Sequence, residues 1–267
     1  MKTAVITGAS SGIGKAAVFK FAKNGWKVFA CMREVKNNIF EGIKNIECVE
    51  MDVSDAVSVK NAYEEICKIS DTVDAVVNNA GYGLNGPFEA ASAEQVQRQY
   101  DVNVFGLMNV TRIFLPLFRK QKFGIFINVS SVAGRTAFPF SSLYISSKWA
   151  VEGFSESLYL ELKPFGIKVK LVEPGTVKTD FFTRSMVFAK EAGFEAYEEM
   201  YEKRNKTAKG NMGAALPEEI AGVIYRAACD KSGRLRYPAG KMAFVVLLLR
   251  KMLPDNIFLK LVGAVKK

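Results

Sequence analysis

Short, almost continuously apolar segments alternate with longer amphipathic segments along most of this 267-residue chain. Strands that are buried on both faces of a sheet need such apolar runs. Their alternation with helices predicts right-handed crossovers, and hence a parallel sheet of about seven strands with helices on both faces, an α/β fold. No repeat or flexible linker interrupts the pattern, so we expect one domain. The strands expected are TAVIT (3–7), KVFACM (27–32), IECVEM (46–51), DAVVN (74–78), GIFINVS (124–130) and IKVKLVEP (167–174).

Composition excludes several classes of function. The chain has no histidine and no C-x-x-C pair, so we expect no metal site. Its net charge is +10, but the basic residues are scattered and form no recognisable nucleic-acid-binding module. The longest apolar run, Met242–Leu249, is far shorter than the about 20 residues that a membrane-spanning helix needs. We expect a cytoplasmic protein, with peripheral membrane association as an alternative.

A glycine-rich loop joins the first expected strand to the first expected helix. In AVITGASSGIGKAA, Gly8, Gly12 and Gly14 leave backbone N–H groups open at a helix N-terminus, and Ser10 and Ser11 add hydroxyl donors. This arrangement suits a phosphate-bearing ligand. The spacing is G-x-x-x-G-x-G instead of the usual G-x-G-x-x-G, but its position after the first strand favours dinucleotide binding.

The end of the second expected strand indicates which dinucleotide. An NAD site usually carries an acidic residue there, which accepts hydrogen bonds from the ribose 2′-hydroxyl. Here Met32 is followed by Arg33, whose guanidinium matches a 2′-phosphate. NADP(H) is therefore expected more than NAD(H). The alternative is that Arg33 is solvated and Glu34 binds the ribose.

A tyrosine and a lysine in SSLYISSKWA could replace the missing histidine in acid–base chemistry. On a helix, Tyr144 and Lys148 lie one turn apart on the same face. An ammonium near a phenol favours the phenolate, so we expect Lys148 to lower the pKa of Tyr144 from its usual value of about 10. Taken alone, Y-x-x-x-K is a common surface pattern.

Further motifs along the chain occur in the order and at the separations that are usual in the short-chain dehydrogenase/reductase family. The sequence resembles that family over about residues 1–180 and more loosely to about 240. The resemblance implies a Rossmann-type fold and hydride transfer between a nicotinamide and a carbonyl or alcohol carbon. Alternatives are a non-catalytic redox sensor or scaffold and a sugar-nucleotide epimerase or dehydratase, whose chains are usually longer. The motifs are TGASSGIG (7–14), NNAG (78–81), NV (103–104), NVSS (128–131), YISSK (144–148) and PG (174–175).

The resemblance also implies catalytic roles. Tyr144 would be the general acid in carbonyl reduction and the base in the reverse direction. Lys148 would lower its pKa and hold the nicotinamide ribose, and Ser131 would orient the substrate oxygen. Asn103 would hold a water that links Lys148 to solvent. Each role suits the hydrogen-bonding chemistry of its side chain.

The same resemblance implies a set of cofactor contacts at the ends of the strands. One departure is that NADP-preferring members often carry a basic residue just before the second glycine of the loop, where this chain has Ser11. The NADP(H) prediction therefore depends mainly on Arg33 and on the missing acidic residue after the second strand. Besides Tyr144 and Lys148, the expected contacts are Gly8, Ser10, Ser11, Gly12, Ile13, Gly14, Arg33, Asp52, Val53, Asn79, Ala80, Gly81, Pro174, Gly175, Val177 and Thr179.

The substrate pocket of this family follows the sixth strand, so we expect residues 180–215 to form a helical substrate lid. Phenylalanines there and on the loop before Tyr144 favour an apolar carbonyl or alcohol, such as a long-chain, retinoid-like or steroid-like molecule. The alternative is that they only pack the lid. They are Phe181, Phe182, Phe188, Phe194, Phe138 and Phe140.

The expected dehydrogenase domain spans 1–240, and a basic amphipathic extension spans 241–267. LRYP and the segment after it look like retinol- and 17β-hydroxysteroid-dehydrogenase-type members and their bacterial relatives. The extension is expected to pack on its own domain or a partner subunit, with an interfacial helix as the alternative. The family also implies a homodimer or homotetramer through helices near 97–121 and 144–163. The apolar repeat of the tail is Ile257, Leu261 and Val265, flanked by Lys260, Lys266 and Lys267.

Overall fold

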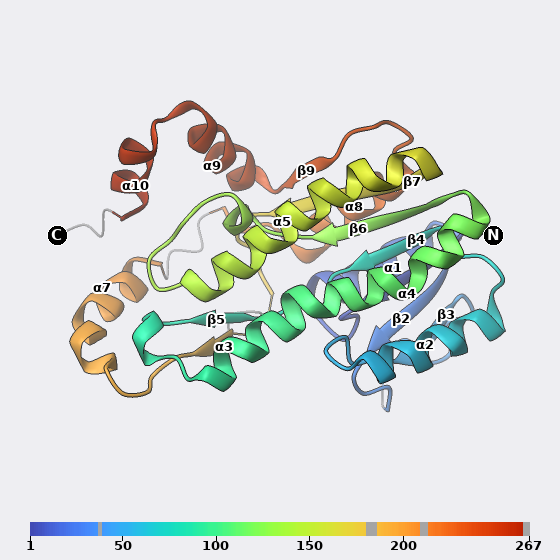
Figure 1. Ribbon diagram of the computed structural model, residues 1–267, viewed down its shortest axis with the longest axis horizontal. Coiled ribbons are helices and arrows are strands. Elements are labelled where there is room, and N and C mark those ends of the chain that lie inside the picture. Colours follow the sequence, from blue (N-terminus) through green and yellow to red (C-terminus); the bar gives the residue numbers. More distant parts are fainter. Residues whose placement is uncertain (37–38, 180–185, 209–212, 264–267) are drawn as a thin grey trace.

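A parallel seven-stranded sheet forms the centre of the molecule (Figure 1). The computed structural model describes residues 1–36, 39–179, 186–208 and 213–263, with the backbone alone at 204–208. The strand order is β3-β2-β1-β4-β6-β7-β9, the doubly wound order expected from the alternation of strands and helices. All six strands predicted above are present, and the seventh lies in the RYPA segment. The bounds are β1 Thr3–Thr7, β2 Lys27–Met32, β3 Ile46–Glu50, β4 Ala75–Asn78, β6 Gly124–Val129, β7 Ile167–Pro174 and β9 Arg236–Ala239.

The apolar strand sequences are explained by burial on both faces of the sheet. Along β1, Val5 belongs to the core on one face, whereas Ala4 and Ile6 belong to the core on the other. All three side chains are fully buried. Because successive side chains of a strand point to opposite faces, both positions must be apolar in a two-sided core.

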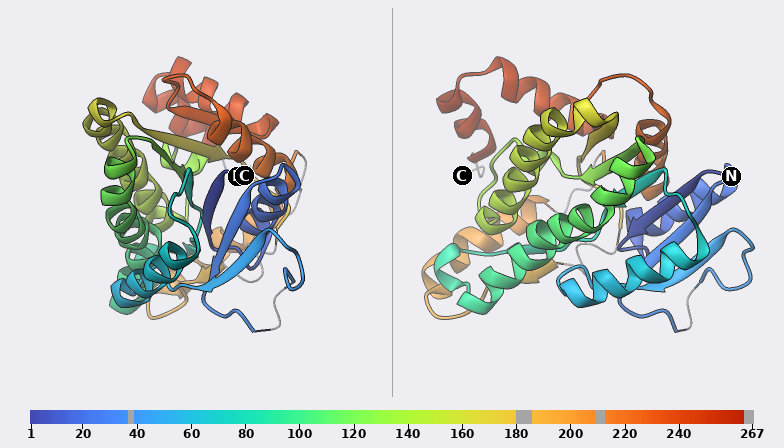
Figure 2. Two further views of the ribbon diagram at one scale, coloured as in Figure 1. Left: turned by 90° about the vertical axis from the view of Figure 1, so that its right-hand side faces the viewer. Right: turned by 45° about the vertical axis from the view of Figure 1, so that its right-hand side comes forward.

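Two layers of helices cover the sheet (Figure 2). Helices α1 and α8 pack against each other on one face, and α2, α4 and α5 cover the opposite face. The fold is therefore the predicted Rossmann-type doubly wound architecture. The bounds are α1 Gly12–Lys23, α2 Ala56–Ile69, α4 Gly106–Gln121, α5 Ser142–Leu162 and α8 Pro217–Cys229.

Smaller elements lie outside the seven-stranded sheet. The expected lid contains a helix, α7, but also strand β8, which pairs in parallel with β5 and which periodicity did not predict. The remaining helices are α3 Ala93–Tyr100, the π-helix η2 Asp101–Phe105, α7 Glu198–Ala208, α9 Lys241–Met252 and α10 Asp255–Gly263. The short strands and 3₁₀ turns are β5 Gly83–Asn85, β8 Met186–Phe188, η1 Phe88–Ala90, η3 Val132–Gly134, η4 Lys163–Phe165 and η5 Phe194–Tyr197.

The C-terminal extension forms two helices, α9 and α10, at one end of the molecule (Figure 1, red). Among the described residues, no helix has both the length and the apolar character required to cross a bilayer. Five residues singled out from the sequence lie outside the described residues: Phe181, Phe182, Val265, Lys266 and Lys267.

Candidate active site

The glycine loop after β1 is shaped to admit a ligand. Gly8 and Gly12 adopt positive φ angles of 64° and 52°, which favour glycine. A Cβ on Gly14 would lie 2.1 Å from the carbonyl oxygen of Gly8, so no other residue fits there. Helix α1 begins at Gly12, and the side chain of its N-cap Ser11 makes no capping hydrogen bond. The first N–H groups of α1 are thus available to a phosphate, and the loop fits the predicted dinucleotide.

The loop after β4 is fastened to the glycine loop. The Asn79 amide donates to the carbonyl oxygens of Thr7 (2.9 Å) and Gly8 (3.2 Å). The Thr7 hydroxyl accepts from the backbone N–H groups of Asn79 and Ala80, both at 3.0 Å. Thr7 begins the motif TGASSGIG but was not among the expected site residues, although a polar residue at the end of an apolar run was a usable signal. The two loops therefore form one continuous surface at the carboxyl edge of the sheet.

The other predicted cofactor contacts lie at the same edge. Arg33 and Glu34 directly follow β2 and are both exposed, so either side chain can reach a ligand from there. After β3, Asp52 accepts hydrogen bonds from the backbone N–H and the hydroxyl of Ser54, at 2.9 and 2.6 Å. This turn holds the buried Val53 in place.

The segment after β7 also approaches the glycine loop. A Cβ on Gly12 would lie 3.3 Å from the methyl group of Thr179. Gly175 donates its N–H to the carbonyl oxygen of Ala239 at 3.1 Å, and Val177 forms a parallel bridge with Ala215. The predicted contacts after β1 and β7 are thus brought together.

Ser131 follows β6 and begins the turn η3. Its hydroxyl accepts from the N–H of Ala133 at 3.1 Å and lies 3.4 Å from the carbonyl oxygen of Pro174, to which it can donate. A hydrogen bond between the Ser131 and Tyr144 hydroxyls lowers the pKa of Tyr144. The two hydroxyls can therefore reach one substrate oxygen together.

Tyr144 and Lys148 share one face of α5, as predicted. The expected lowering of the Tyr144 pKa by Lys148 is wrong for the chain by itself. Burial outweighs the hydrogen bond with Ser131 and raises the pKa of Tyr144 to about 12. The Lys148 ammonium donates instead to the carbonyl oxygen of Val129 at 2.9 Å and lies 5.9 Å from the centre of the Tyr144 ring. Burial also lowers the pKa of Lys148 to about 8, because desolvation disfavours its charged form.

Asn103 lies in the π-helix η2 before α4. Its amide accepts from the N–H of Tyr82 at 3.0 Å, and it donates to the carbonyl oxygen of Tyr82 (2.9 Å) and to the Ser147 hydroxyl (3.2 Å). These bonds tie the segment after Gly81 to the helix that carries Lys148. The side-chain N–H groups of Asn103 thus already donate to protein atoms. A water held by Asn103 would therefore have to donate a hydrogen bond to one of its oxygen atoms. Single-turn π-helices often occur at functional sites.

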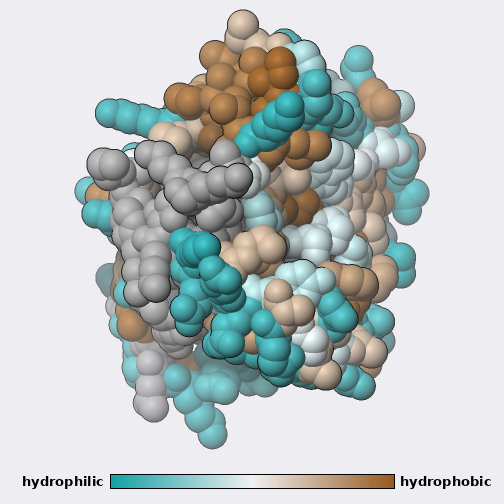
Figure 3. Space-filling model, turned by 90° about the vertical axis from the view of Figure 1, so that its left-hand side faces the viewer, coloured by the Kyte–Doolittle hydropathy of each residue, from teal (hydrophilic) through white to brown (hydrophobic). Residues whose placement is uncertain are grey.

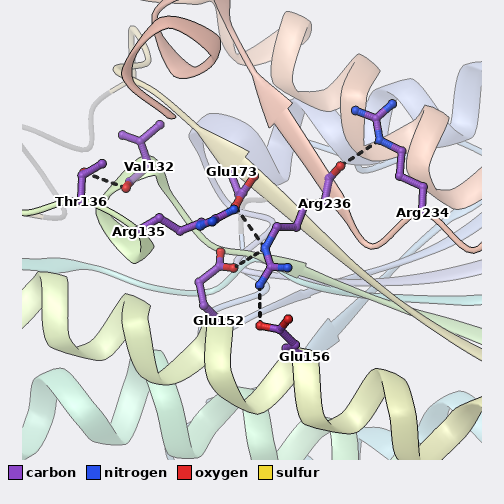
Figure 4. A network of polar contacts seen from close by, with 8 residues as sticks. All are labelled: Val132, Arg135, Thr136, Glu152, Glu156, Glu173, Arg234 and Arg236. Atoms are coloured by element: carbon purple, nitrogen blue, oxygen red, sulfur yellow. Dashed lines mark hydrogen bonds and ion pairs between the residues drawn. The ribbon is translucent and has the colours of Figure 1, made fainter. Parts of the chain in front are cut away.

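A buried acidic pair behind the site was missed by the sequence analysis (Figure 4). Glu152 lies one turn after Lys148 and Glu173 lies just before Pro174; their residues are 5% and 1% exposed. Arg236 of β9 lies 3.2 Å from Glu152 and 3.6 Å from Glu173. Burial and the charge of Glu152 raise the pKa of Glu173 to about 7, against the influence of Arg135 and Arg236. Glu152 in turn raises the pKa of Lys148 against the effect of burial.

Three of the six phenylalanines expected around the substrate converge on Tyr201 of α7. The rings of Phe140, Phe188 and Phe194 lie 5.4, 6.1 and 5.6 Å from its ring, centre to centre. Phe138 is half-buried on the loop before α5. Tyr201 was not predicted, because a single tyrosine in a charged helical sequence carries no distinguishing signal.

Comparison with known proteins agrees with this geometry. The sequence pattern of the family described as short chain dehydrogenase matches residues 2–187. The chain is 36% identical over 264 residues to the uncharacterized oxidoreductase YusZ of Bacillus subtilis, covering 95% of this chain and 94% of that protein. It is 34% identical over 255 residues to the 3-ketodihydrosphingosine reductase of Bacteroides thetaiotaomicron, covering 95% and 93%. A short-chain dehydrogenase structure from Streptomyces avermitilis matches with a TM-score of 0.85 and 29% identity, covering 99% and 97%.

Proposed function

The chain belongs to the short-chain dehydrogenase family, and we propose that it uses NADP(H) to interconvert a ketone and an alcohol on an apolar, long-chain molecule. Membership makes it an NAD(P)-dependent oxidoreductase that acts on CH–OH and C=O groups of a small-molecule substrate. The cofactor preference, the residue roles and the substrate class are the parts that we propose. A non-catalytic sensor or scaffold is not favoured by this family membership.

The observation that carries the mechanism is the hydrogen-bonded pair Ser131–Tyr144 at the carboxyl edge of the sheet. With a pKa of about 12, Tyr144 is protonated at neutral pH and is ready to donate to a carbonyl oxygen. Ser131 donates to the same oxygen and orients it. A nicotinamide held at this edge would supply the hydride for the new C–H bond, and Tyr144 donates the proton for the O–H bond. In the reverse direction Tyr144 accepts the proton.

Lys148 restores the proton and stabilises the phenolate that Tyr144 becomes. It is 7% exposed, and its ammonium is held at the Val129 carbonyl oxygen. From there it can also bond the nicotinamide ribose. A water on an oxygen atom of Asn103 would link it to solvent, while the amide holds the neighbouring loop. Lys148 plays this role in its protonated form. Because burial lowers its pKa to about 8, that form is lost as the pH rises above about 8.

We assign the preference for NADP(H) to Arg33. Its side chain is exposed after β2, where the ribose of the adenosine half is expected, and Met32 before it cannot accept a hydrogen bond from a 2′-hydroxyl. A guanidinium binds a phosphate through two parallel hydrogen bonds. The remaining predicted contacts from Gly8 to Thr179 are proposed to hold the rest of the dinucleotide.

The apolar, long-chain substrate is supported by two observations. The rings of Phe188, Phe194 and Tyr201 lie within the described part of the segment 180–215, which we propose as the lid, and Phe140 meets Tyr201 from the loop before α5. In addition, the relative from Bacteroides thetaiotaomicron, which is similar over almost its whole length, is named for a ketone on a long alkyl chain.

We further propose that copies of the chain assemble through the outer faces of α4 and α5. Large apolar side chains are exposed there: Trp149 and Leu160 on α5 are 49% and 65% exposed, and Phe105, the N-cap of α4, is 47% exposed. Trp149 and Leu160 are eleven residues apart, which places them on one side of α5. A dimer or tetramer that covers these side chains would be detected by light scattering and lost in Trp149→Glu.

The test of the proposed function is oxidation of NADPH and NADH with a series of 3-keto compounds of increasing alkyl length. We expect kcat/KM to be higher with NADPH and to rise with chain length. Equal rates with both cofactors would overturn the Arg33 assignment. Equal rates across the series would overturn the apolar substrate.

A further inference from the structure

The helices α9 and α10 stand at one end of the molecule and bury little of their own surface. In each of them only one residue is buried, Ala243 and Phe258 respectively, among residues that are all described. The Arg250 side chain joins them, because its guanidinium pairs with Asp255 at 2.5 Å and lies 5.2 Å from the Phe258 ring centre. The two helices therefore form one hook-shaped unit (Figure 1).

This unit presents an apolar surface to solvent (Figure 3, brown). Along α9 the exposed side chains recur at positions i, i+3, i+4 and i+7, so they share one side of the helix. Such a surface is costly in water unless something covers it. The exposed side chains on α9 are Met242, Phe244, Val245, Leu248, Leu249 and Met252, and those on α10 are Ile257, Leu259 and Leu261; each is 41–70% exposed.

The charges around this surface identify what covers it. Residues 241–263 carry one acidic residue, Asp255, and it is already paired. A second copy of the chain that met this face by twofold symmetry would bring like charges together. An anionic lipid surface offers both an apolar layer and compensating negative charge. Besides Arg250, which pairs with Asp255, the cations are Lys241, Lys251 and Lys260.

The unit is continuous with the active site. A Cβ on Gly175 would lie 3.2 Å from the backbone nitrogen of Ala243. Helix α9 also packs against η3, the turn that follows Ser131. The carboxyl ends of the strands and the α9–α10 unit lie toward the same side of the molecule (Figure 1). A lipid layer that contacted this unit would thus lie beside the entrance to the site.

We propose that α9 and α10 dock the protein on an anionic lipid surface, with the apolar side chains in the interface and the cations at the headgroups. The docking depends on these two helices alone. Its use, delivery of a long-chain ketone to Tyr144 without passage through water, rests on the proposed function.

The test is co-sedimentation of the full chain with phosphatidylcholine vesicles, with and without phosphatidylglycerol. We expect binding to the anionic vesicles that weakens with salt, and a loss of about tenfold or more in Leu248→Glu/Leu249→Glu. Val57→Glu is the matched control, because Val57 is 65% exposed on α2 and lies outside this unit. Unchanged binding in the double variant, or equal binding to neutral vesicles, would overturn the proposal. The proposal would also be overturned if the wild type did not bind vesicles and the double variant turned an oligomer into a monomer.

Turnover of a short, water-soluble ketone separates this proposal from the proposed function. The double variant should keep wild-type turnover of that ketone, because it leaves the site untouched. Vesicle binding without turnover of any ketone would support the docking and refute the proposed function. Turnover without vesicle binding would refute the docking alone.

Discussion

Replacing the buried Glu173 by glutamine should change how the stability of the protein depends on pH. In the folded chain, burial and the neighbouring Glu152 raise the pKa of Glu173 from its usual 4.5 to about 7. A carboxyl whose pKa is raised by folding stabilises the folded state below pH 4.5, where it is protonated in both states. That contribution is lost as the pH rises through about 7.

The size of the effect follows from the same values. Each pH unit between the pKa of Glu173 in the unfolded and in the folded state corresponds to about 1.4 kcal/mol. Ionising Glu173 therefore costs the folded state about 3 kcal/mol between pH 4.5 and 7. Glutamine keeps nearly the same shape but cannot ionise. Glu173→Gln should therefore show a stability curve that is flatter by about this amount over the interval.

Urea unfolding between pH 4.5 and 8 measures the effect. The control is Glu156→Gln, because Glu156 pairs with the same Arg236 at 2.9 Å but its side chain is 59% exposed. Arg236 lowers the pKa of Glu156, so the control should follow the wild type above pH 4.5. Parallel curves for the wild type and Glu173→Gln would show that Glu173 is ionised throughout and would refute the account of the buried pair.

Three further substitutions test the site itself. Arg33→Ala should weaken NADPH binding at least tenfold and leave NADH binding nearly unchanged, as measured by cofactor fluorescence; equal losses would exclude a phosphate contact. Glu152→Gln removes the charge that raises the pKa of Lys148, so the alkaline limb of the kcat profile should move to lower pH, and a stationary limb would contradict this coupling. Gly14→Ala should abolish cofactor binding because its Cβ meets the glycine loop at 2.1 Å, whereas Gly153→Ala, with no atom within 4 Å, should bind normally.

The fold was predictable because the central strands are apolar at most of their positions. That pattern is required only where helices cover both faces of a sheet, and it located six strands to within one residue. Strand β8 was not predictable, because three residues carry too little periodicity to separate a strand from a turn. Its partner β5 lies about a hundred residues earlier, and only the folded chain brings Gly83 beside Met186.

The site was predictable to the extent that its residues follow strands. Parallel strands end at one edge, so Gly8, Asn79, Ser131 and Gly175 had to gather there. The raised pKa of Tyr144 was not predictable, since spacing along a helix says nothing about how deeply a phenol is buried. The acidic pair escaped detection for a related reason, because its members are 21 residues apart and meet only through packing of α5 against β7.

The central claim is that the Tyr144 hydroxyl transfers the proton, and Tyr144→Phe tests it most directly. The measurement is single-turnover oxidation of bound NADPH by a ketone substrate, with cofactor affinity determined in parallel. Tyr159→Phe is the control, because Tyr159 also lies on α5 but bonds the carbonyl oxygen of Gly233. The account predicts a loss of about a hundred- to ten-thousand-fold in rate with unchanged cofactor affinity for Tyr144→Phe only. Turnover by Tyr144→Phe at the rate of the wild type would contradict it.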